Sequence, residues 1–296
     1  MCNQPTEFKG NFMRLNKILN PSALLLAIGM MSLMGAPSVH AAQPEPWQLG
    51  FQPAATDMMA RISSFNDFLL ILMTAITVFV LGLMVYVMLR FNAKANPVPS
   101  KTSHNTLIEV VWTVIPILIL LVIAVPSFRL LYDQATPEAD MTIKATGYQW
   151  YWGYEYPDHG DFAFDALMLE DDELQPGQPR LLTTDNAVVV PVDTTVRVLV
   201  TAADVIHNWA MPAFGVKMDA YPGRLNETWF RANKTGTYYG QCSELCGIRH
   251  SFMPIMVKVV EKEEFTAWVE QAKVEFASYD EANTNLAEVS ATHLSK

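Results

Sequence analysis

Two long uncharged runs dominate the hydrophobic pattern of the chain. They cover residues 68–89 and 110–128, and the second contains Pro116 and Pro126. About 20 consecutive apolar residues suffice to cross a bilayer as a helix, and prolines are tolerated where neighbouring helices satisfy the backbone. The pattern therefore predicts two transmembrane helices, at 68–89 and 110–128, in a helical hairpin over residues 43–131.

A shorter apolar segment lies near the N-terminus. Residues 23–34 follow three basic residues and precede small residues that include Ala41 and Ala42. A basic start, a short apolar core and a small-residue cleavage site are typical of a secretory signal peptide. We expect residues 1–42 to be a signal peptide cleaved after Ala41 or Ala42. A retained N-terminal anchor is the alternative.

The loop between the two runs predicts the orientation of the hairpin. It contains Arg90, Lys94 and Lys101, with no acidic residue before Glu109. Loops rich in lysine and arginine remain on the cytoplasmic side of the membrane. Both ends of the mature chain are then expected outside the cytoplasm, as a signal peptide also requires.

Beyond residue 131 the pattern changes to short β-branched and aromatic runs separated by turn residues. Such runs predict strands, and about 130 residues of them predict a sandwich or barrel. The expected strands cover residues 142–148, 187–192, 195–200, 228–231, 235–241 and 254–260. This all-β domain is expected over residues 132–262.

The pattern changes again in the C-terminal segment, residues 263–296. Phe265, Trp268, Val269, Ala272 and Phe276 recur at helical spacing. This spacing predicts an amphipathic helix that packs on the domain or on another subunit, followed by a polar tail.

Composition supports a membrane protein with an acidic domain. Hydrophobic residues make up 51% of the 296 residues and charged residues 17%, which is more apolar than an ordinary soluble domain. Residues 132–296 carry 12 basic and 25 acidic side chains, a net charge of −13. An acidic exported surface disfavours nucleic acid and attracts a basic partner, although the charge could serve solubility alone.

The most distinctive polar pattern consists of Cys242, Cys246, His250 and Met253. Thiolate, imidazole and thioether groups are soft ligands that suit copper. A structural zinc site would not use the thioether, and a blue-copper site needs only one cysteine. Two copper ions sharing both thiolates, each with its own histidine, would use every donor. A disulfide between the two cysteines is the alternative, because exported proteins form disulfides readily.

A second copper site needs a second histidine. Three of the six histidines fall in the predicted signal peptide, in the loop across the membrane and in the polar tail: His40, His104 and His293. His159 and His207 remain. His207 is the better candidate, because it ends a largely apolar run at 196–206, where a loop edge can face a neighbouring loop.

These residues together resemble a known family. His207, followed thirty-five residues later by Cys-Ser-Glu-Leu-Cys-Gly-Ile-Arg-His-Ser-Phe-Met at 242–253, resembles the binuclear copper (CuA) signature of cytochrome c oxidase subunit II. Gly-Tyr-Gln-Trp-Tyr-Trp at 147–152 is similar to its aromatic motif. The resemblance covers roughly residues 65–268. It implies two transmembrane helices followed by an all-β cupredoxin-like Greek-key barrel.

The resemblance also implies a ligand set. His207 and Met253 would complete one copper, and His250 and the backbone carbonyl of Glu244 the other, with Cys242 and Cys246 bridging. The Glu244 carboxylate would also reach a Mg²⁺ ion shared with subunit I. The apolar side chains expected to exclude water from the site are Leu245, Ile248, Phe252 and Pro254.

Further roles follow from the resemblance alone. Trp150 would carry electrons between a docked cytochrome c and the copper pair, although the alternating aromatic residues from Tyr148 to Tyr156 also predict a strand with one buried face. Glu109 would lie at the mouth of a proton path into subunit I, although an acid in a first helical turn is favoured by the helix dipole anyway. The acids implied in docking are Glu155, Asp158, Asp165, Asp185 and Asp204.

The expected function is that of an electron-accepting subunit in a bacterial terminal oxidase of the inner membrane, with the copper domain and both termini in the periplasm. It would pass electrons from cytochrome c to haem in subunit I, where oxygen is reduced to water with proton pumping. Subunits I and III and cytochrome c are the expected partners. A quinol oxidase subunit lacks the thiolates, a copper-delivery protein needs no aromatic motif, and a nitrous oxide reductase has no two-helix anchor.

Overall fold

A computed structural model describes residues 40–135 and 137–277 of the chain. The predicted signal peptide lies outside the described residues up to position 39, as does the tail from 278 onward. The described α-helices and strands are β1 (His40–Ala42), α2 (Asp57–Arg90), α3 (Thr106–Asp133), β2 (Met141–Tyr148), β3 (Tyr151–Glu155), β4 (Ala163–Ala166), β5 (Val188–Pro191), β6 (Val196–Ala202), β7 (His207–Met211), β8 (Val216–Ala220), β9 (Asn226–Phe230), β10 (Gly236–Cys242), β11 (Pro254–Val260) and α4 (Lys262–Glu275). A short 3₁₀ helix at His250–Phe252 precedes β11.

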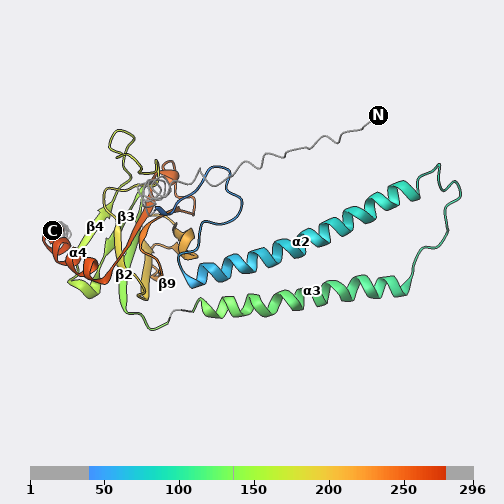
Figure 1. The fold of residues 1–296 in the computed structure, drawn as a ribbon, viewed down its shortest axis with the longest axis horizontal. Helices are drawn as coiled ribbons and strands as arrows, with labels where there is room; N and C mark the ends of the chain where they lie inside the picture. The colour runs from blue at the N-terminus through green and yellow to red at the C-terminus, as the bar shows by residue number, and fades with distance from the viewer. Residues whose placement is uncertain (1–39, 136, 278–296) are drawn as a thin grey trace, which may run out of the picture. The chain divides into compact units, whose positions relative to one another are not determined.

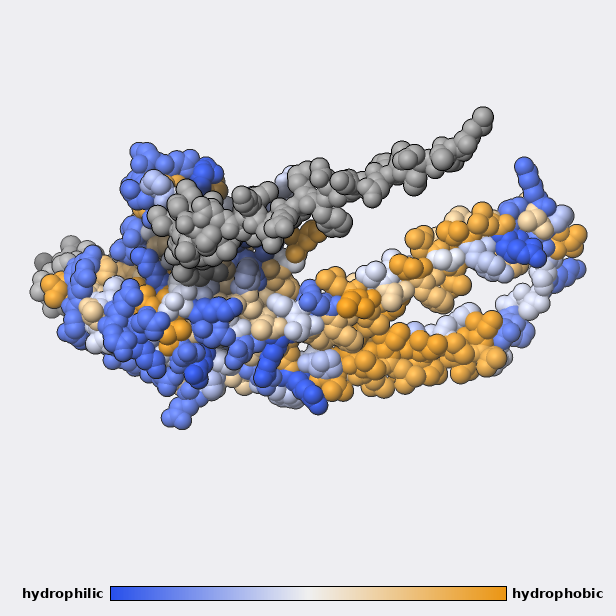
Figure 2. All heavy atoms as spheres, in the orientation of Figure 1, coloured by the Kyte–Doolittle hydropathy of each residue, from blue (hydrophilic) through white to orange (hydrophobic). Residues whose placement is uncertain are grey.

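The two predicted spans lie inside the long helices α2 and α3, which run in opposite directions (Figure 1). Their apolar side chains are exposed along most of their length, as the hydropathy colouring shows (Figure 2). Helices this long and apolar, with most of their side chains exposed, are suited to lipid. The prediction of two membrane helices is confirmed.

Both helices extend beyond the apolar runs that predicted them. α2 begins at Asp57, where the Thr56 hydroxyl accepts a hydrogen bond from the amide of Met59 at 2.9 Å. α3 begins after Asn105, whose side-chain oxygen accepts from the amide of Ile108 at 3.2 Å. Caps of this kind satisfy amides that the first turn leaves free, so the cap rather than the onset of hydrophobicity determines where each helix begins.

The domain beyond the hairpin consists of two mixed β-sheets. One has the strand order β5-β11-β10-β7-β8, with β1 also pairing with β10, and the other the order β4-β3-β2-β6-β9. The sheets face each other across one apolar core, in which Trp152, Tyr154, Trp209 and Phe230 are almost fully buried. The Trp209 indole donates to the Tyr154 hydroxyl from the opposite sheet at 3.3 Å. This is the all-β domain that was predicted.

The strand expected at 195–200 is β6, but the apolar run at 196–206 does not continue as one strand. β6 ends at Ala202, a bend follows, and His207 begins β7. The aromatic stretch, for which alternation predicted a strand, is interrupted. A two-residue turn at Gln149 and Trp150 separates β2 from β3, and Tyr148 pairs with Tyr151 across it. Sequence reasoning also did not predict strands β4, β7 and β8.

The predicted C-terminal helix is α4, which packs against the sheet edge near β5. Phe265, Val269 and Ala272 are buried, at the predicted spacing. Trp268 contacts the ring of Tyr156, with centroids 5.2 Å apart. The alternation predicted for the aromatic residues holds from Trp152 onward, because Trp152, Tyr154 and Tyr156 are all buried.

Candidate metal centre

The two sheet strands β7 and β10 bring together parts of the chain that are far apart in sequence. They pair in antiparallel register, with Trp209 opposite Cys242. Since side chains alternate between the faces of a strand, His207 lies on the same face as Trp209, one step nearer the end of the sheet. The register therefore places the His207 imidazole beside the first cysteine.

The soft donors cluster at this end of the sandwich. The Sγ atoms of Cys242 and Cys246 are 3.9 Å apart, and Nδ1 of His207 is 3.9 Å from Cys242 Sγ. On the other side of the pair, Cys246 Sγ lies 3.5 Å from His250 Nδ1 and 3.4 Å from Met253 Sδ. Each cysteine thus has one imidazole beside it.

The cysteines are free thiols in this structure. Their sulfur atoms are far outside the bonding distance of a disulfide, which is about 2.05 Å. Cys242, Cys246 and Met253 are buried and His207 is completely inaccessible to solvent. The donors His207, Cys242 and Cys246 lie within 4.8 Å of one another, close enough to ligate a common ion.

The loop between β10 and β11 is held by the β2–β3 turn. Gln149 Nε2 and Trp150 Nε1 both donate to the backbone carbonyl of Cys246, at 2.7 and 3.2 Å. Gly247 follows with φ +123°, and a Cβ on it would lie 3.0 Å from the Trp150 ring. A side chain at 247 would separate the turn from the loop, so glycine is required there.

The His207 ring is oriented from both of its nitrogens. While Nδ1 faces Cys242, Nε2 lies 2.9 Å from Asp204 Oδ1. The other oxygen of Asp204 accepts from the amide of Gln149 at 2.7 Å. A carboxylate bound to the second nitrogen fixes the tautomer of a metal-binding histidine and increases its basicity.

The same contacts determine the protonation of the site. Burial alone would lower the pKa of His207, but its hydrogen bonds to Cys242 and Asp204 raise it above the usual value. Burial opposes ionisation of Asp204, yet the hydrogen bonds from His207 and from backbone amides hold its pKa low.

The two thiols differ from each other. Burial disfavours the Cys242 thiolate, but the neighbouring His207 lowers its pKa below the usual value. Burial and the nearby Cys242 raise the pKa of Cys246 to about 12. A bound cation would remove this difference, because metal coordination deprotonates a thiol outright.

The donor set fits copper better than other metals. Two thiolates, two imidazoles and a thioether are soft ligands, and no carboxylate belongs to the described cluster. Mg²⁺ and Ca²⁺ would require oxygen ligands, and structural zinc would leave Met253 without a role. The residues present therefore fit a copper site.

Trp150 is half-buried at the turn rather than inside a strand, and its indole donates a hydrogen bond to the loop between β10 and β11. The turn at 149–150 takes Trp150 out of the buried aromatic face that the alternation predicted. By contrast, the expectation that Leu245 and Ile248 exclude water was wrong. These side chains are 77% and 87% exposed, and form an apolar surface around the site instead.

The other predicted residues lie in varied surroundings. The Glu244 carboxylate is exposed, while its backbone oxygen lies 3.4 Å from Cys242 Sγ. Asp204 contacts the His207 ring. The sequence did not predict this contact, because the only indication of it is that the two residues are three positions apart. Glu109 caps α3, its Oε1 accepting from the amide of Asn105 at 3.3 Å.

The remaining four acids are distributed over the domain. Glu155 pairs with Lys144 at 2.7 Å, and Asp185 accepts from the amide of Leu167. Asp158 accepts a hydrogen bond from the amide of Thr142, near the start of β2. Gly147, near the end of β2, lies against the His207 side chain. Thr142 and Gly147 are five residues apart, about 16 Å along a strand, so Asp158 lies at the opposite end of β2 from His207. Asp165 follows Phe164 within β4.

Comparison with known proteins agrees with this geometry. A family model described as "Cytochrome C oxidase subunit II, periplasmic domain" matches residues 141–260, and one described as "Cytochrome C oxidase subunit II, transmembrane domain" matches residues 44–130.

Individual relatives show the same likeness. "Probable cytochrome c oxidase subunit 2" of Rickettsia bellii is 60% identical over 77% of this chain and 86% of its own length. "Cytochrome c oxidase subunit 2" of Cereibacter sphaeroides is 46% identical over 83% and 90%. The crystal structure of the periplasmic domain of subunit II of cytochrome oxidase of Bradyrhizobium japonicum has 64% identity, a TM-score of 0.45, and covers 48% of this chain and 99% of that one. With two membrane helices, a β-domain and both family models in place, the chain belongs to the cytochrome c oxidase subunit II family.

Proposed function

We propose that this chain is the subunit through which electrons enter a respiratory terminal oxidase. Two copper ions would share the thiolates of Cys242 and Cys246. His207 and Met253 would complete one copper, and His250 and the backbone carbonyl of Glu244 the other. The soft donor cluster supports this most strongly: two thiols 3.9 Å apart, each with an imidazole within 3.9 Å, buried at the end of a rigid sandwich.

When bound, such a pair supplies a site that takes up and releases one electron. The protein residues hold its ligands still. β7 and β10 fix His207 and Cys242 through their register, while the turn at Gln149 and Trp150 fixes Cys246 through its carbonyl. Because the ligands are already close together, little rearrangement is needed between redox states, which favours fast transfer.

Trp150 is proposed as the point at which electrons reach the site. Its indole is half-buried and hydrogen-bonds to the carbonyl of a copper-bridging cysteine, so it joins the surface to the site. The exposed Leu245 and Ile248 provide apolar surface beside it. A cytochrome c that docks here would place its haem edge near Trp150, and Glu155, Asp165 and Asp185 would contribute negative charge on this domain. Asp158, at the far end of β2, would add only to the overall negative charge.

The remaining roles concern other subunits. The electrons would pass to haem in subunit I, which reduces oxygen to water with coupled proton pumping, and subunit III would complete the complex. The exposed Glu244 carboxylate can reach a Mg²⁺ ion only if partner residues supply further oxygen ligands. Glu109, at the loop end of α3, would lie near a proton path in subunit I.

The proposed location is a bacterial inner membrane crossed twice. The loop with Arg90, Lys94 and Lys101 would face the cytoplasm. The copper domain and both termini would then lie in the periplasm, after removal of residues 1–42 as a signal peptide.

An electron paramagnetic resonance spectrum with a copper count tests the proposal. Residues 132–296 are loaded with copper, with the detergent-solubilised full chain as a check on the truncated domain. One electron shared equally by two copper nuclei should give a seven-line hyperfine pattern and two coppers per chain. A four-line pattern with one copper, or a Cys242–Cys246 disulfide without copper, would contradict it.

A further inference from the structure

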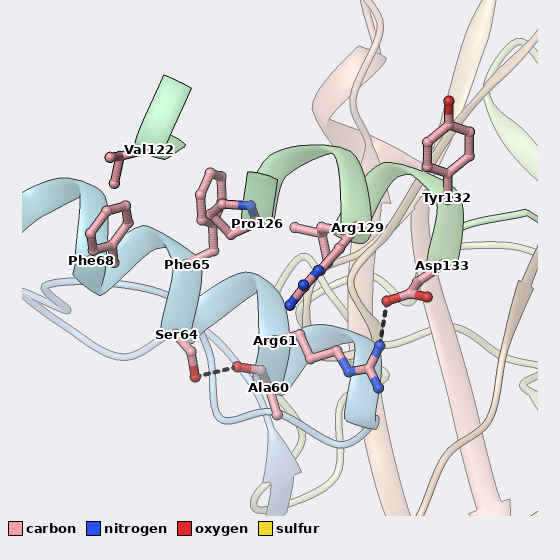
Figure 3. A pocket seen from close by; sticks show the side chains of 11 residues that line it. Ala60, Arg61, Ser64, Phe65, Phe68, Val122, Pro126, Arg129, Tyr132 and Asp133 are labelled. Carbon is pink, nitrogen blue, oxygen red and sulfur yellow. Dashed lines mark hydrogen bonds and ion pairs between the residues drawn. The ribbon is translucent and has the colours of Figure 1, made fainter. Parts of the chain in front are cut away.

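A groove lies between α2 and α3 at the end of the hairpin nearest the β-domain. It encloses about 1080 Å³ and is lined from α2 by residues such as Arg61, Phe65 and Phe68, and from α3 by Val122 and Arg129 (Figure 3). None of these residues belongs to the metal site. The groove lies where the apolar runs of both helices end.

The lining changes character along the groove. Val122 and Phe68 are exposed apolar side chains at one end, whereas Arg61 and Arg129 lie at the other. Val122 and Arg129 are seven residues apart on α3, about 10 Å along the helix axis. The groove thus has an apolar lining at one end and guanidinium groups about 10 Å away. A phospholipid has the same order, with an apolar acyl chain followed by a charged phosphate.

The two arginines differ in their partners. Arg61 forms an ion pair with Asp133 at 2.5 Å, which links α2 to α3 across the groove. Among the described residues, no hydrogen bond or ion pair engages Arg129. In Figure 3 the Arg129 side chain extends from α3 toward α2. The charged lining of the groove therefore has a net charge of +1, with one guanidinium still available.

Arg129 is set apart from the other basic residues of the hairpin. Most of these lie at the opposite end, in the loop with Arg90, Lys94 and Lys101. An arginine near the end of a membrane helix extends its guanidinium to the interface, where lipid phosphates lie, and a guanidinium binds phosphate in a fork-like geometry. Basic pockets between membrane helices on the cytoplasmic side bind lipid head groups by the same pairing of charges.

We propose that this groove binds one anionic phospholipid. Its phosphate contacts Arg129, with Arg61 nearby, and one acyl chain lies over Phe65, Phe68 and Val122. The lipid fills the space between the helices next to the β-domain and adds to the link that Arg61 and Asp133 provide.

Native mass spectrometry of the assembled oxidase tests this assignment. The complex is purified in mild detergent, stripped of loosely bound lipid, and offered phosphatidylglycerol or phosphatidylcholine at equal concentration. The wild type should retain one phosphatidylglycerol that Arg129→Gln retains about tenfold more weakly. Arg129→Lys, which keeps the charge and loses the fork-like geometry, should retain an intermediate amount. Arg90→Gln, which removes the same charge at the opposite end of the hairpin, should behave as the wild type.

A second variant separates the lipid from the charge. Val122→Trp fills the apolar end of the groove and leaves both arginines in place, so it should also lose the lipid. Equal retention by wild type, Arg129→Gln and Val122→Trp would overturn the proposal. So would equal retention of phosphatidylcholine, absence of phosphatidylglycerol from the wild-type complex, or full displacement by inorganic phosphate alone.

Discussion

At the scale of single residues, Asp204 connects the histidine of the metal site to the aromatic turn. One of its oxygens faces His207 Nε2, and the other accepts from the backbone of Gln149. Gln149 in turn binds the carbonyl of Cys246. One carboxylate thus connects a proposed ligand on β7 to a proposed ligand on the β10–β11 loop. Docking of a partner would not require these internal contacts.

Asp204→Asn should weaken copper binding by about 10- to 100-fold, because an amide cannot fix the His207 tautomer as a carboxylate does. Copper affinity measured against a competing chelator, with the hyperfine spectrum, checks this. Asp158→Asn, at the far end of β2, is the matched control and should change neither quantity. If Asp204 served docking alone, its variant would bind copper normally and only associate more slowly with a basic cytochrome.

Met253 offers a different test of the site. Met253→Leu should keep copper and cost less than about 1.5 kcal/mol of stability, since the two side chains have similar volume. The reduction potential should rise, because loss of the thioether removes electron density from the oxidised metal. Met256→Leu, at a buried methionine in β11 three residues further on, is the control. An unchanged potential in Met253→Leu would remove Met253 from the ligand set.

At the scale of elements, α4 is held by an aromatic cluster that includes a titratable ring. His159 lies edge-on to Phe265, with centroids 5.2 Å apart, and near Tyr156. Burial lowers the pKa of His159 below 6.5; Lys273 lowers it further, and Asp158 opposes this. The neutral ring is therefore the form that packs against α4.

This arrangement predicts that α4 is less well protected in acid. The unfolded histidine takes up a proton below pH 6.5 more readily than the folded one, so stability is lost as pH falls through this range. The protection factors of the α4 amides, which correct each exchange rate for its intrinsic dependence on pH, should fall on moving from about one unit above pH 6.5 to one unit below. His159→Gln should abolish this dependence and His104→Gln, in the loop between the membrane helices, should retain it. Protection factors that respond to pH equally in wild type and His159→Gln would exclude this role for His159.

Elements with strong periodicity were predictable and those defined by long-range pairing were not. The apolar runs predicted α2 and α3, and the 3.6-residue pattern predicted α4. The donors Cys242, Cys246, His250 and Met253 were also predictable, because they are close in sequence. The break before His207 was not, since Ala203–Ile206 stays largely apolar while the backbone bends, and the turn at Trp150 forms only because β2 pairs with β3.

At the scale of the whole molecule, charge and apolar surface are segregated. The two helices carry most of the exposed apolar side chains, and the β-domain is mainly hydrophilic (Figure 2). Residues 132–296 hold a net charge of −13. Such a domain attracts a basic protein over a distance limited by the Debye length.

Association with a basic cytochrome c should therefore slow by at least about tenfold as the ionic strength rises from about 0.01 to 0.15 M. Stopped-flow mixing of the reduced cytochrome with the copper-loaded protein measures this rate. An acidic redox protein serves as the control, and its association should accelerate with salt. A rate independent of salt for the basic partner would mean that the acidic surface does not guide docking.

The pairing of Trp209 with Cys242 has a consequence for transplanting this site. A peptide containing only residues 242–253 would carry the thiolates, one imidazole and the thioether, but not His207. If the loop is grafted onto another antiparallel sheet, the host must supply the missing histidine. In the host strand, that histidine must stand two residues before the residue that pairs with the first cysteine of the loop, as His207 stands before Trp209. A host shifted by one residue would direct that histidine to the other face. Transfer of the site to another protein therefore depends on the register of the host strands, which the sequence of the grafted loop does not specify.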